Sequence, residues 1–299
     1  ATGLECIWVC DLPAPELKAL AMELETARLR LRPFVFSDGN GLSAIVGDEE
    51  TMRYSFPMTR EESDSFLERS LLRRKPPVGY ALEEREKPGC LAGYVLFCPL
   101  DEPGVYELGW FLRQDLWGRG YALEISQALL DYAFDTLALR RVEGETTDLR
   151  RAGRLLEKLG MAKLGETQVA DCQGRPAALY QYAVTGEQWR ERNRLLAFFD
   201  EENRRDWDHY QTFLHPEVVW ELHQPGGQVE RIQGIPAYLA RIRVAYEGWD
   251  GQFRCERLKR DGEGIKVWLV NDRGERSRER FQFQNGLIWR EWEDLTDEV

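Results

Sequence analysis

A carboxylate and two glycines stand close together in the stretch YELGWFLRQDLWGRGYA, residues 106–122. Glu107 lies in a segment whose polarity alternates with a period of two, which predicts a β-strand. Gly118 and Gly120 follow, just before a segment whose apolar residues recur at helical spacing. Backbone N–H groups at a helix start are free donors on a favourable dipole, and glycines let a phosphate approach the main chain. The spacing therefore predicts an enzyme that holds a phosphate-bearing cofactor beside a strand-borne carboxylate.

Two other phosphate-binding motifs do not fit this stretch. The dinucleotide-binding fingerprint needs a third glycine three residues after the second, but the chain has Leu123 there. That fingerprint also follows a first strand, whereas Gly118 lies far into the chain. No Gly-Lys-Ser/Thr sequence follows, so a P-loop is excluded as well.

Three segments, in order, resemble the GNAT superfamily of acyl-CoA-dependent N-acyltransferases, and most of all its ribosomal-protein N-terminal acetyltransferase branch. LETARLRLRPFVFSD (residues 24–38) resembles the first strand and turn of that branch. DLWGRGYALE (115–124) resembles its coenzyme A pyrophosphate loop, and RLLEKLGMAKLGE (154–166) resembles its late helix and strand. The resemblance spans residues 23–189 and implies an α/β fold, a mixed twisted sheet with flanking helices.

The resemblance also implies an N-acetyltransferase that uses acetyl-CoA as co-substrate and attacks the thioester directly with a primary amine. A free amine is mostly protonated, so a base must take its proton, and Glu107 is the expected catalytic base. A backbone N–H near Trp110 is expected to stabilise the oxyanion, and no metal is required. The expected cofactor-binding residues are Leu108, Trp110, Leu112, Trp117, Gly118, Arg119, Gly120, Tyr121 and Ala122.

The chain departs from the family pattern in its late helix. Leu149 and Ala152 stand where members of the family usually carry Asn and Ser, and Leu156 stands where others carry the Tyr that protonates the departing thiolate. These departures leave a non-catalytic acyl-CoA binder as an alternative. Glu107 also has an alternative interpretation, as a strand residue paired across the sheet.

Composition narrows the class of partner. The 299 residues carry a net charge of −12, which argues against a nucleic-acid partner and favours a cationic amine, either on a small molecule or at a protein N-terminus. No apolar run reaches the roughly 18 residues that a membrane span needs, so no membrane association is expected. Six dispersed cysteines without a C-x-x-C pair favour a reducing compartment, the cytoplasm.

The first residues are expected to be an N-terminal extension, residues 1–22. They include acidic residues and two prolines and lack a basic n-region, so no signal peptide is expected. Family openings resemble MELETARLRLRPF, which makes Met22 look like a natural start.

A second domain is expected at residues 190–299. The stretch LLAFFDEENRRDWDHYQTFLHPEVVWEL resembles the SnoaL-like, nuclear transport factor 2-like superfamily, which implies a cone-shaped α+β domain with a curved sheet. The implied roles are small-molecule binding, isomerase or hydrolase activity, or homodimerisation. His209, His215 and His223 have no common metal-ligand spacing, so no metal site is expected.

Periodicity places the other elements. Strands are predicted at residues 28–35, 79–84, 91–98, 106–112, 141–146, 161–169, 177–184, 218–223, 252–259, 264–271, 276–284 and 287–294. Helices are predicted at residues 37–46, 60–72, 121–137, 149–159, 188–205, 207–214 and 235–246.

Overall fold

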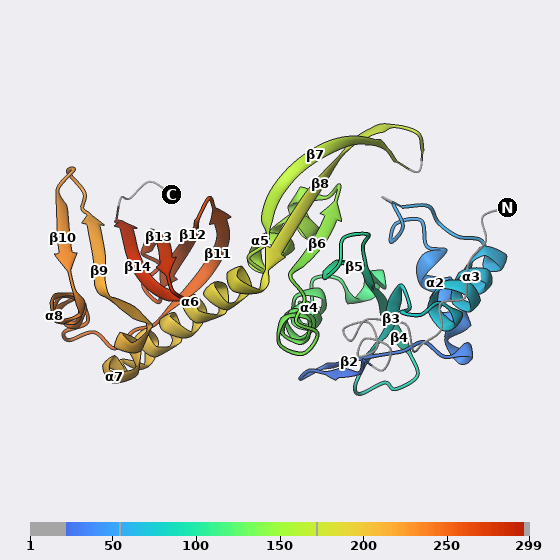
Figure 1. Cartoon of the computed structure of the whole chain (residues 1–299), viewed down its shortest axis with the longest axis horizontal. Coiled ribbons are helices and arrows are strands. Elements are labelled where there is room, and N and C mark those ends of the chain that lie inside the picture. Colours follow the sequence, from blue (N-terminus) through green and yellow to red (C-terminus); the bar gives the residue numbers. More distant parts are fainter. Residues whose placement is uncertain (1–21, 54, 172, 296–299) are drawn as a thin grey trace. The chain divides into compact units, whose positions relative to one another are not determined.

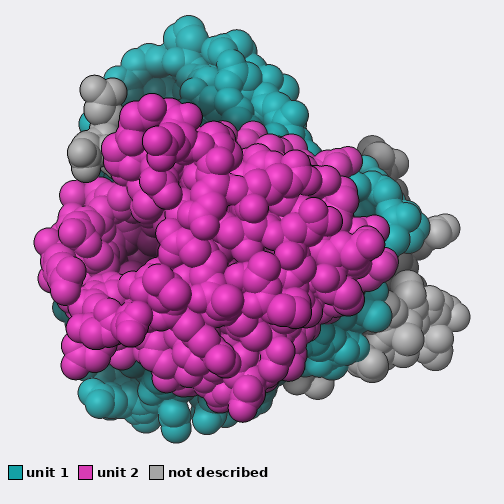
Figure 2. All heavy atoms as spheres, turned by 90° about the vertical axis from the view of Figure 1, so that its left-hand side faces the viewer, with its two compact units in different colours: residues 1–155, 163–186 teal, residues 156–162, 187–299 magenta. Residues whose placement is uncertain are grey.

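The computed structural model describes residues 22–53, 55–171 and 173–295, which form two compact units (Figures 1 and 2). Unit 1 comprises the residues up to 155 together with 163–186, and unit 2 comprises 156–162 and the residues from 187 onward. The boundary expected between residues 189 and 190 falls inside helix α6 (Gly186–Arg204). Apart from Met22, the expected N-terminal extension lies outside the described residues.

Unit 1 is built on an eight-stranded mixed sheet with the order β1-β2-β3-β4-β5-β6-β8-β7. Strands β5 and β6 pair in parallel, whereas β2–β3, β3–β4, β4–β5 and β6–β8 pair antiparallel. The strands are β1 Leu24–Glu25, β2 Leu29–Arg32, β3 Gly79–Glu84, β4 Leu91–Pro99, β5 Val105–Leu112, β6 Arg141–Thr146, β7 Ala162–Ala170 and β8 Pro176–Thr185.

The helices of unit 1 begin where local chemistry favours a start. Thr59 and Glu62 form a capping box at α3, in which each side chain accepts a hydrogen bond from the other residue's backbone N–H. Gly120 begins α4 with a φ of 78°, a left-handed conformation that suits glycine. The helices are α2 Gly39–Val46, α3 Arg60–Phe66 and α4 Tyr121–Asp131, with π-helical turns at Leu67–Arg73, Tyr132–Thr136 and Leu149–Gly153. Helix α5, Arg154–Lys158, begins in unit 1 and belongs to unit 2 from residue 156 onward.

Side chains along β5 alternate between two faces of the sheet, and other side chains pack against each face. On one face Trp110 donates from Nε1 to Ser126 Oγ on α4, at 2.5 Å. On the other face Phe111 stacks on Tyr94 at 4.7 Å between ring centroids, against the apolar cluster that α2 contributes. Glu107 lies on the same face of the strand as Phe111, because residues two and four apart share a face.

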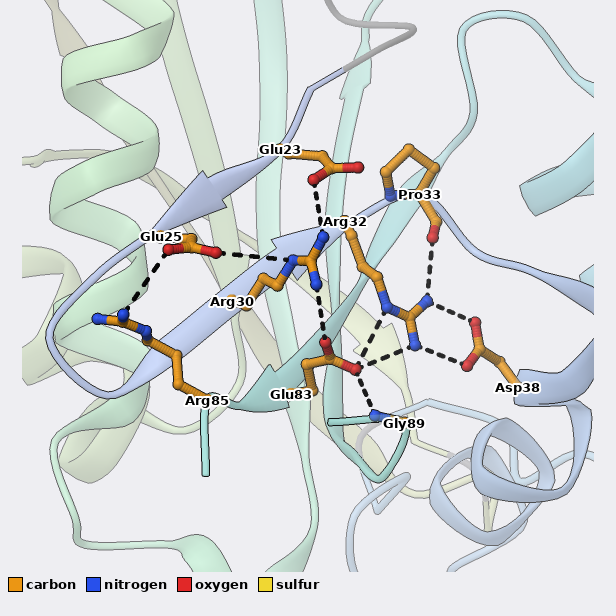
Figure 3. A network of polar contacts seen from close by, with 9 residues as sticks. All are labelled: Glu23, Glu25, Arg30, Arg32, Pro33, Asp38, Glu83, Arg85 and Gly89. Carbon is orange, nitrogen blue, oxygen red and sulfur yellow. Dashed lines mark hydrogen bonds and ion pairs between the residues drawn. The ribbon is translucent and has the colours of Figure 1, made fainter. Parts of the chain in front are cut away.

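A network of ion pairs and hydrogen bonds connects β2, β3 and the turn at Asp38 near the start of unit 1 (Figure 3). Arg32 on β2 reaches both oxygens of Asp38, at 2.8 and 2.9 Å, and Glu83 of β3 at 3.1 Å. Asp38 in turn accepts the N–H of Val35, and Glu83 accepts the N–H of Gly89. Asp38 and Glu83 are 4% and 2% exposed, and their two charges face two guanidinium groups, because Arg30 also pairs with Glu83 at 3.9 Å.

Unit 2 packs three helices against a six-stranded sheet with the order β10-β9-β14-β13-β12-β11. Only β14 and β9 pair in parallel in the described residues of this sheet. Helix α8 lies beside β9 and β10, and the face of unit 2 that Figure 2 shows is hollowed. The elements are α6, α7 Trp207–Tyr210, α8 Ile235–Ala245, β9 Leu214–His223, β10 Val229–Gln233, β11 Phe253–Asp261, β12 Gly264–Asn271, β13 Arg276–Gln284 and β14 Leu287–Asp294.

Most predicted elements are present within one to four residues of the expected ends. Two strands, β1 and β10, were not predicted. The predicted helix at 207–214 is shorter than expected: α7 and a 3₁₀ turn end at Phe213, and Leu214 begins β9. None of the helices in the described residues is both long and apolar enough to cross a membrane.

Candidate active site

Strands β5 and β6 separate beyond Glu107. The two strands pair only from Val105 to Glu107 on β5, although β5 continues to Leu112. Beyond that point β6 stays paired with β8, through Thr146. In the described residues, no strand therefore pairs with residues 108–112 on the side of β6. Backbone amides along that edge are left to bind an extended, amide-bearing molecule by strand-like hydrogen bonds.

The glycine loop lies between this edge and helix α4. Gly118 and Gly120 have φ values of 76° and 78°, so both need the left-handed conformation that glycine adopts without strain. Within the described residues, the backbone N–H groups from Gly118 to Leu123 donate no hydrogen bond, whereas Glu124 donates to the Gly120 carbonyl. A Cβ on Gly118 would meet nothing within 4 Å. The loop therefore offers free donors and open space at a helix N-terminus.

Neighbouring side chains hold the loop in place. Arg28 donates to the carbonyl of Arg119 at 2.9 Å and pairs with Glu124 at 2.6 Å. Trp117 donates from Nε1 to the Leu112 carbonyl at 2.8 Å, which ties the loop to the end of β5. The guanidinium of Arg151 lies 5.1 Å from the Trp117 ring and is mostly exposed, so a cationic side chain stands beside the free N–H groups.

Glu107 lies at the point where β5 and β6 separate. Burial raises the pKa of its carboxyl, and the charges of Glu145 and Glu143 raise it further. Glu143 is its direct neighbour across the parallel pair. No described residue forms a hydrogen bond or ion pair with the Glu107 side chain. A free carboxylate with a raised pKa is suited to accept a proton near neutral pH.

The face around Glu107 also carries a thiol and a phenol. Cys98 is the cross-strand neighbour of Glu107 on β4, and burial raises the pKa of its thiol to about 11, with Glu107 adding to the rise. Burial likewise raises the pKa of Tyr94, and Cys98 and Glu107 contribute. Both groups therefore stay protonated near neutral pH, and the carboxylate is the proton acceptor on this face.

Comparison with known proteins identifies the class of enzyme. The sequence profile of the family described as "Acetyltransferase (GNAT) domain" matches residues 28–162. The uncharacterized N-acetyltransferase YnaD of Bacillus subtilis is 26% identical over 172 residues, which cover 56% of this chain and 99% of YnaD. The N-terminal half of this chain is a GNAT acetyltransferase domain.

Two further proteins resemble the same part of the chain. The FsC-acetyl coenzyme A-N(2)-transacetylase of Aspergillus fumigatus is 25% identical over 185 residues, which cover 56% of this chain and 77% of that protein. The crystal structure of a GNAT-family acetyltransferase from Bacillus anthracis has a TM-score of 0.50 at 24% identity and covers 56% of this chain and 99% of that one. The expected mixed sheet with flanking helices is thereby confirmed, and the protein is an acetyltransferase enzyme.

The GNAT domain brings most of the predicted site residues together. Leu108, Trp110 and Leu112 lie on the strand that leaves β6, and residues 117–122 form the adjoining loop and helix start. The Trp110 side chain is turned toward α4, where it donates to Ser126, and the Leu112 side chain is buried. Leu149 is 42% exposed, whereas Leu156 is fully buried.

Sequence reasoning missed several residues of the GNAT site. Glu143 and Glu145 were not singled out, because a strand neighbour across a parallel pair has no fixed sequence spacing. Arg28 was read only as part of the first strand, although it supports the glycine loop from about ninety residues away. The basic residues 150 and 151 were not missed, and they stand on a turn that Asp148 caps.

Two other sites on the molecule contain none of these residues. In unit 1 a pocket of about 420 Å³ is lined by Phe36, Ser37, Gly39, Asn40, Arg60, Asp64, Leu67 and Glu68. In unit 2 the side chains of Glu201, Asp206 and His209 bring ligand atoms within 4.8 Å of one another. Glu201 also pairs with Arg204 at 3.0 Å, and Asp206 caps α7, so the carboxylates of this trio are already engaged.

Proposed function

We propose that the GNAT domain catalyses N-acetylation, transferring an acetyl group from acetyl-CoA to a primary amine. The observation that carries the proposal is the separation of β5 from β6 at Glu107, beside a helix start with free N–H groups. A coenzyme A molecule has an amide-bearing arm and a pyrophosphate, and these two features match the open strand edge and the glycine loop.

The proposed cofactor site uses mainly backbone groups. The N–H groups of residues 118–122 would bind the pyrophosphate, with Arg119 and Arg151 supplying positive charge nearby. The main chain of Leu108, Trp110 and Leu112 would pair with the arm, which carries the thioester toward Glu107. A backbone N–H near Trp110 would stabilise the oxyanion that forms on the thioester carbonyl.

The proposed chemistry is a direct attack. The neutral amine nitrogen forms a bond to the thioester carbonyl carbon, the carbon–sulfur bond breaks, and the coenzyme A thiolate leaves. Glu107 takes a proton from the amine, directly or through one water molecule. Its raised pKa makes it a stronger base than an ordinary carboxylate, while binding both reactants at one point supplies much of the rate.

The acceptor is proposed to be a cation in solution. Glu143 and Glu145 lie on the same face of β6 and add negative charge near Glu107, which favours an ammonium group before it loses its proton. A protein N-terminus, as in the ribosomal-protein branch, and a small-molecule amine both meet this requirement. The whole chain carries a net charge of −12, which adds to the attraction of a cation.

The role of unit 2 in this function stays a prediction. The division into an acetyltransferase domain at 23–189 and a SnoaL-like domain at 190–299 is proposed on resemblance. The helices and the six-stranded sheet, in which β10 adds to the expected elements, support that assignment. Shaping of substrate access, small-molecule chemistry and homodimerisation are its proposed roles.

A thiol-release assay tests the acetyltransferase proposal. With acetyl-CoA and a panel of peptide N-terminal amines, aminoglycosides and polyamines, we expect turnover with at least one amine class. Glu107→Gln should lower kcat by about 10²–10⁴-fold, the usual contribution of a general base, and leave coenzyme A binding unchanged. Glu86→Gln, at an exposed turn, is the matched control. Full turnover in Glu107→Gln would contradict the base assignment.

The cofactor site has a separate test with a strain-matched control. Gly118→Ala and Gly274→Ala each place a Cβ on a residue with φ of 76° or 82°, and neither Cβ meets an atom within 4 Å. Both should lose about 1 kcal/mol of stability from the left-handed conformation. Only Gly118→Ala should also raise the KM for acetyl-CoA, because its Cβ enters the proposed pyrophosphate space. Equal KM values for the two variants would place the pyrophosphate elsewhere.

A further inference from the structure

The six-stranded sheet of unit 2 has an apolar face and a basic face. Val267 and Leu269 of β12, Phe281 of β13 and Ile288 of β14 point inward and pack in one core with residues of α6, α7 and α8. The alternate residues of these strands point outward. The outward positions of β11 to β14 include eight basic residues, which we call the basic face: Arg254, Arg257, Lys259, Lys266, Arg276, Arg278, Arg280 and Arg290.

Three cations of the basic face lie side by side across three strands. Lys259 of β11 is the direct neighbour of Lys266 of β12, and Lys266 is the direct neighbour of Arg280 of β13. Their side chains are 45%, 41% and 35% exposed, so all three are accessible to a partner. Like charges directly opposite each other in a sheet are destabilising. Such a row therefore favours the binding of an anion.

Four carboxylates reach the basic face and do not balance its charge. Three of them are each shared by two cations at 2.8–3.8 Å: Asp261 by Lys266 and Arg280, Glu157 of α5 by Arg257 and Lys259, and Glu256 by Arg254 and Arg276. The fourth, Asp294, pairs with Arg278. Arg290 stacks on Trp289 at 4.4 Å and forms no ion pair within the described residues. Eight cations therefore face four carboxylates, in a chain whose net charge is −12.

Two partly exposed tryptophans stand among these cations. Trp268 of β12 has Arg257 and Arg278 as its direct neighbours on either side, and the Arg257 guanidinium lies 4.7 Å from its ring. Trp292 of β14 is the direct neighbour of Arg280, whose guanidinium lies 5.2 Å from its ring. Aromatic rings beside cations are the pattern by which proteins bind single-stranded nucleic acid, because the bases stack while the phosphates are neutralised.

The alternative occupants fit this face less well. A two-fold dimer uses the same patch of both chains, so a second copy would bring two basic faces together. A duplex stacks its bases on one another, whereas a single strand can present base faces to aromatic side chains. An acidic protein would match the charge but would leave the two tryptophans without a role.

We propose that the basic face of unit 2 binds single-stranded nucleic acid, with phosphates on Lys259, Lys266 and Arg280 and bases stacked on Trp268 and Trp292. The net charge of the chain argued against a nucleic-acid partner, but charge acts locally, because screening at physiological salt extends over only about 8 Å. The site belongs to unit 2 alone and does not depend on the acetyltransferase reaction.

Fluorescence anisotropy of a labelled oligothymidylate of about 12 nucleotides, titrated with the full chain, tests the proposal. We expect saturable binding whose affinity falls as salt rises from about 50 to 200 mM. Lys259→Gln and Lys266→Gln each remove one phosphate contact, so each should lower the slope of log affinity against log salt by about 0.7. Lys87→Gln removes the same charge at an exposed turn of unit 1 and should leave binding unchanged.

The stacking contribution has its own variant. Trp268→Leu should weaken binding by about tenfold or more and leave the salt slope unchanged, because leucine cannot stack on a base. Trp249→Leu, a partly exposed tryptophan of unit 2 outside the basic face, is the matched control. Excess coenzyme A should not displace the oligonucleotide, which separates this site from the proposed cofactor site of the GNAT domain. Circular dichroism of each variant confirms that it is folded before titration.

Three results would overturn the proposal. The first is absence of oligothymidylate and oligouridylate binding by the folded wild-type chain at about 50 mM salt. The second is binding that the double variant Lys259→Gln/Lys266→Gln leaves unchanged. The third is self-association, or binding of a glutamate-rich peptide, that the double variant abolishes while neither oligonucleotide binds the wild-type chain.

Discussion

The two units bury carboxylates in opposite ways. In unit 1, Asp38 and Glu83 surround the guanidinium of Arg32, which contacts both side chains at hydrogen-bond distance (Figure 3). In unit 2, four neighbouring glutamates form no ion pair within the described residues. Glu202 and Glu291 accept hydrogen bonds from tyrosine hydroxyls, Glu279 accepts one from Ser277, and Glu293 lies opposite Glu279 across the sheet. A balanced network holds secondary-structure elements together, whereas an unbalanced one leaves charge to be supplied by protons or by a ligand.

The difference teaches which buried charges are structural. Removing a partner from the balanced network must destabilise unit 1, because it creates charge without a counter-ion. Removing an acid from the unbalanced cluster must relieve unit 2, because it takes away repulsion. The two changes should therefore shift the free energy of unfolding in opposite directions, and measuring both shifts tests the comparison.

The largest effect is expected from Arg32→Met. The substitution leaves Asp38 buried without a cation and leaves Glu83 with Arg30 alone, at 3.9 Å, and loss of one partner of a buried ion pair costs about 3–5 kcal/mol. Urea denaturation, followed by fluorescence, measures the free energy of unfolding. Arg60→Met removes an exposed guanidinium that pairs with Asp64 four residues later, and should cost only about 0.5 kcal/mol. Similar losses for the two variants would show that the network of Arg32 is not a buried ion pair in solution.

A smaller change in the free energy of unfolding is expected when the pH is raised. The carboxyl pKa of Glu293 is raised by burial from 4.5 in the unfolded chain to about 7 in the folded chain, so the folded state holds an extra proton between these values. The contribution of this carboxyl to the free energy of unfolding of unit 2 should be fully present below pH 4.5 and fall by about 3 kcal/mol as pH rises to 7. Urea titrations at pH 5, 6, 7 and 8 measure the slope. Glu293→Gln should flatten it, and an unchanged slope in that variant would assign the pH dependence to other groups.

The smallest change in the free energy of unfolding is expected from Glu279→Gln. Burial and the charge of Glu293 opposite raise the pKa of Glu279, so ionising this carboxyl as the pH rises destabilises the fold. The uncharged amide avoids this loss, and the free energy of unfolding at pH 8 should rise by about 1 kcal/mol. The amide keeps the size of the side chain and its bond to Ser277. Glu263→Gln should change stability by less than about 0.5 kcal/mol. A loss of stability in Glu279→Gln would show that the cluster is a satisfied structural network.

Elements with strong alternation could be predicted from the sequence. The strands at 79–84, 141–146 and 264–271 were expected with the bounds that the structure has. The strand β10, VERIQ, was missed because only one of its residues is buried and its polar residues fit a loop equally well. Leu214 was assigned to a helix because its apolar spacing continues that of the preceding turn.

The candidate site was predictable where it is local in the chain. Gly118, Gly120 and Glu107 lie within fourteen residues, and their types alone indicate a phosphate loop beside a strand. The cluster in unit 2 was not predictable. Strand β13 carries Arg278 and Arg280 on one face and Glu279 on the other, so charge alternates with charge and the sequence does not show which face is buried.

The opening between β5 and β6 has a consequence for how this enzyme tolerates genetic change. The cofactor-binding groups proposed at this opening are those of the main chain, which every residue except proline supplies. Side chains at positions 108–112 can therefore drift under selection for packing alone, and the capacity to hold an amide-bearing arm persists. Robustness of this kind leaves the acids around Glu107 free to diverge toward new acceptors while the proposed donor site is retained.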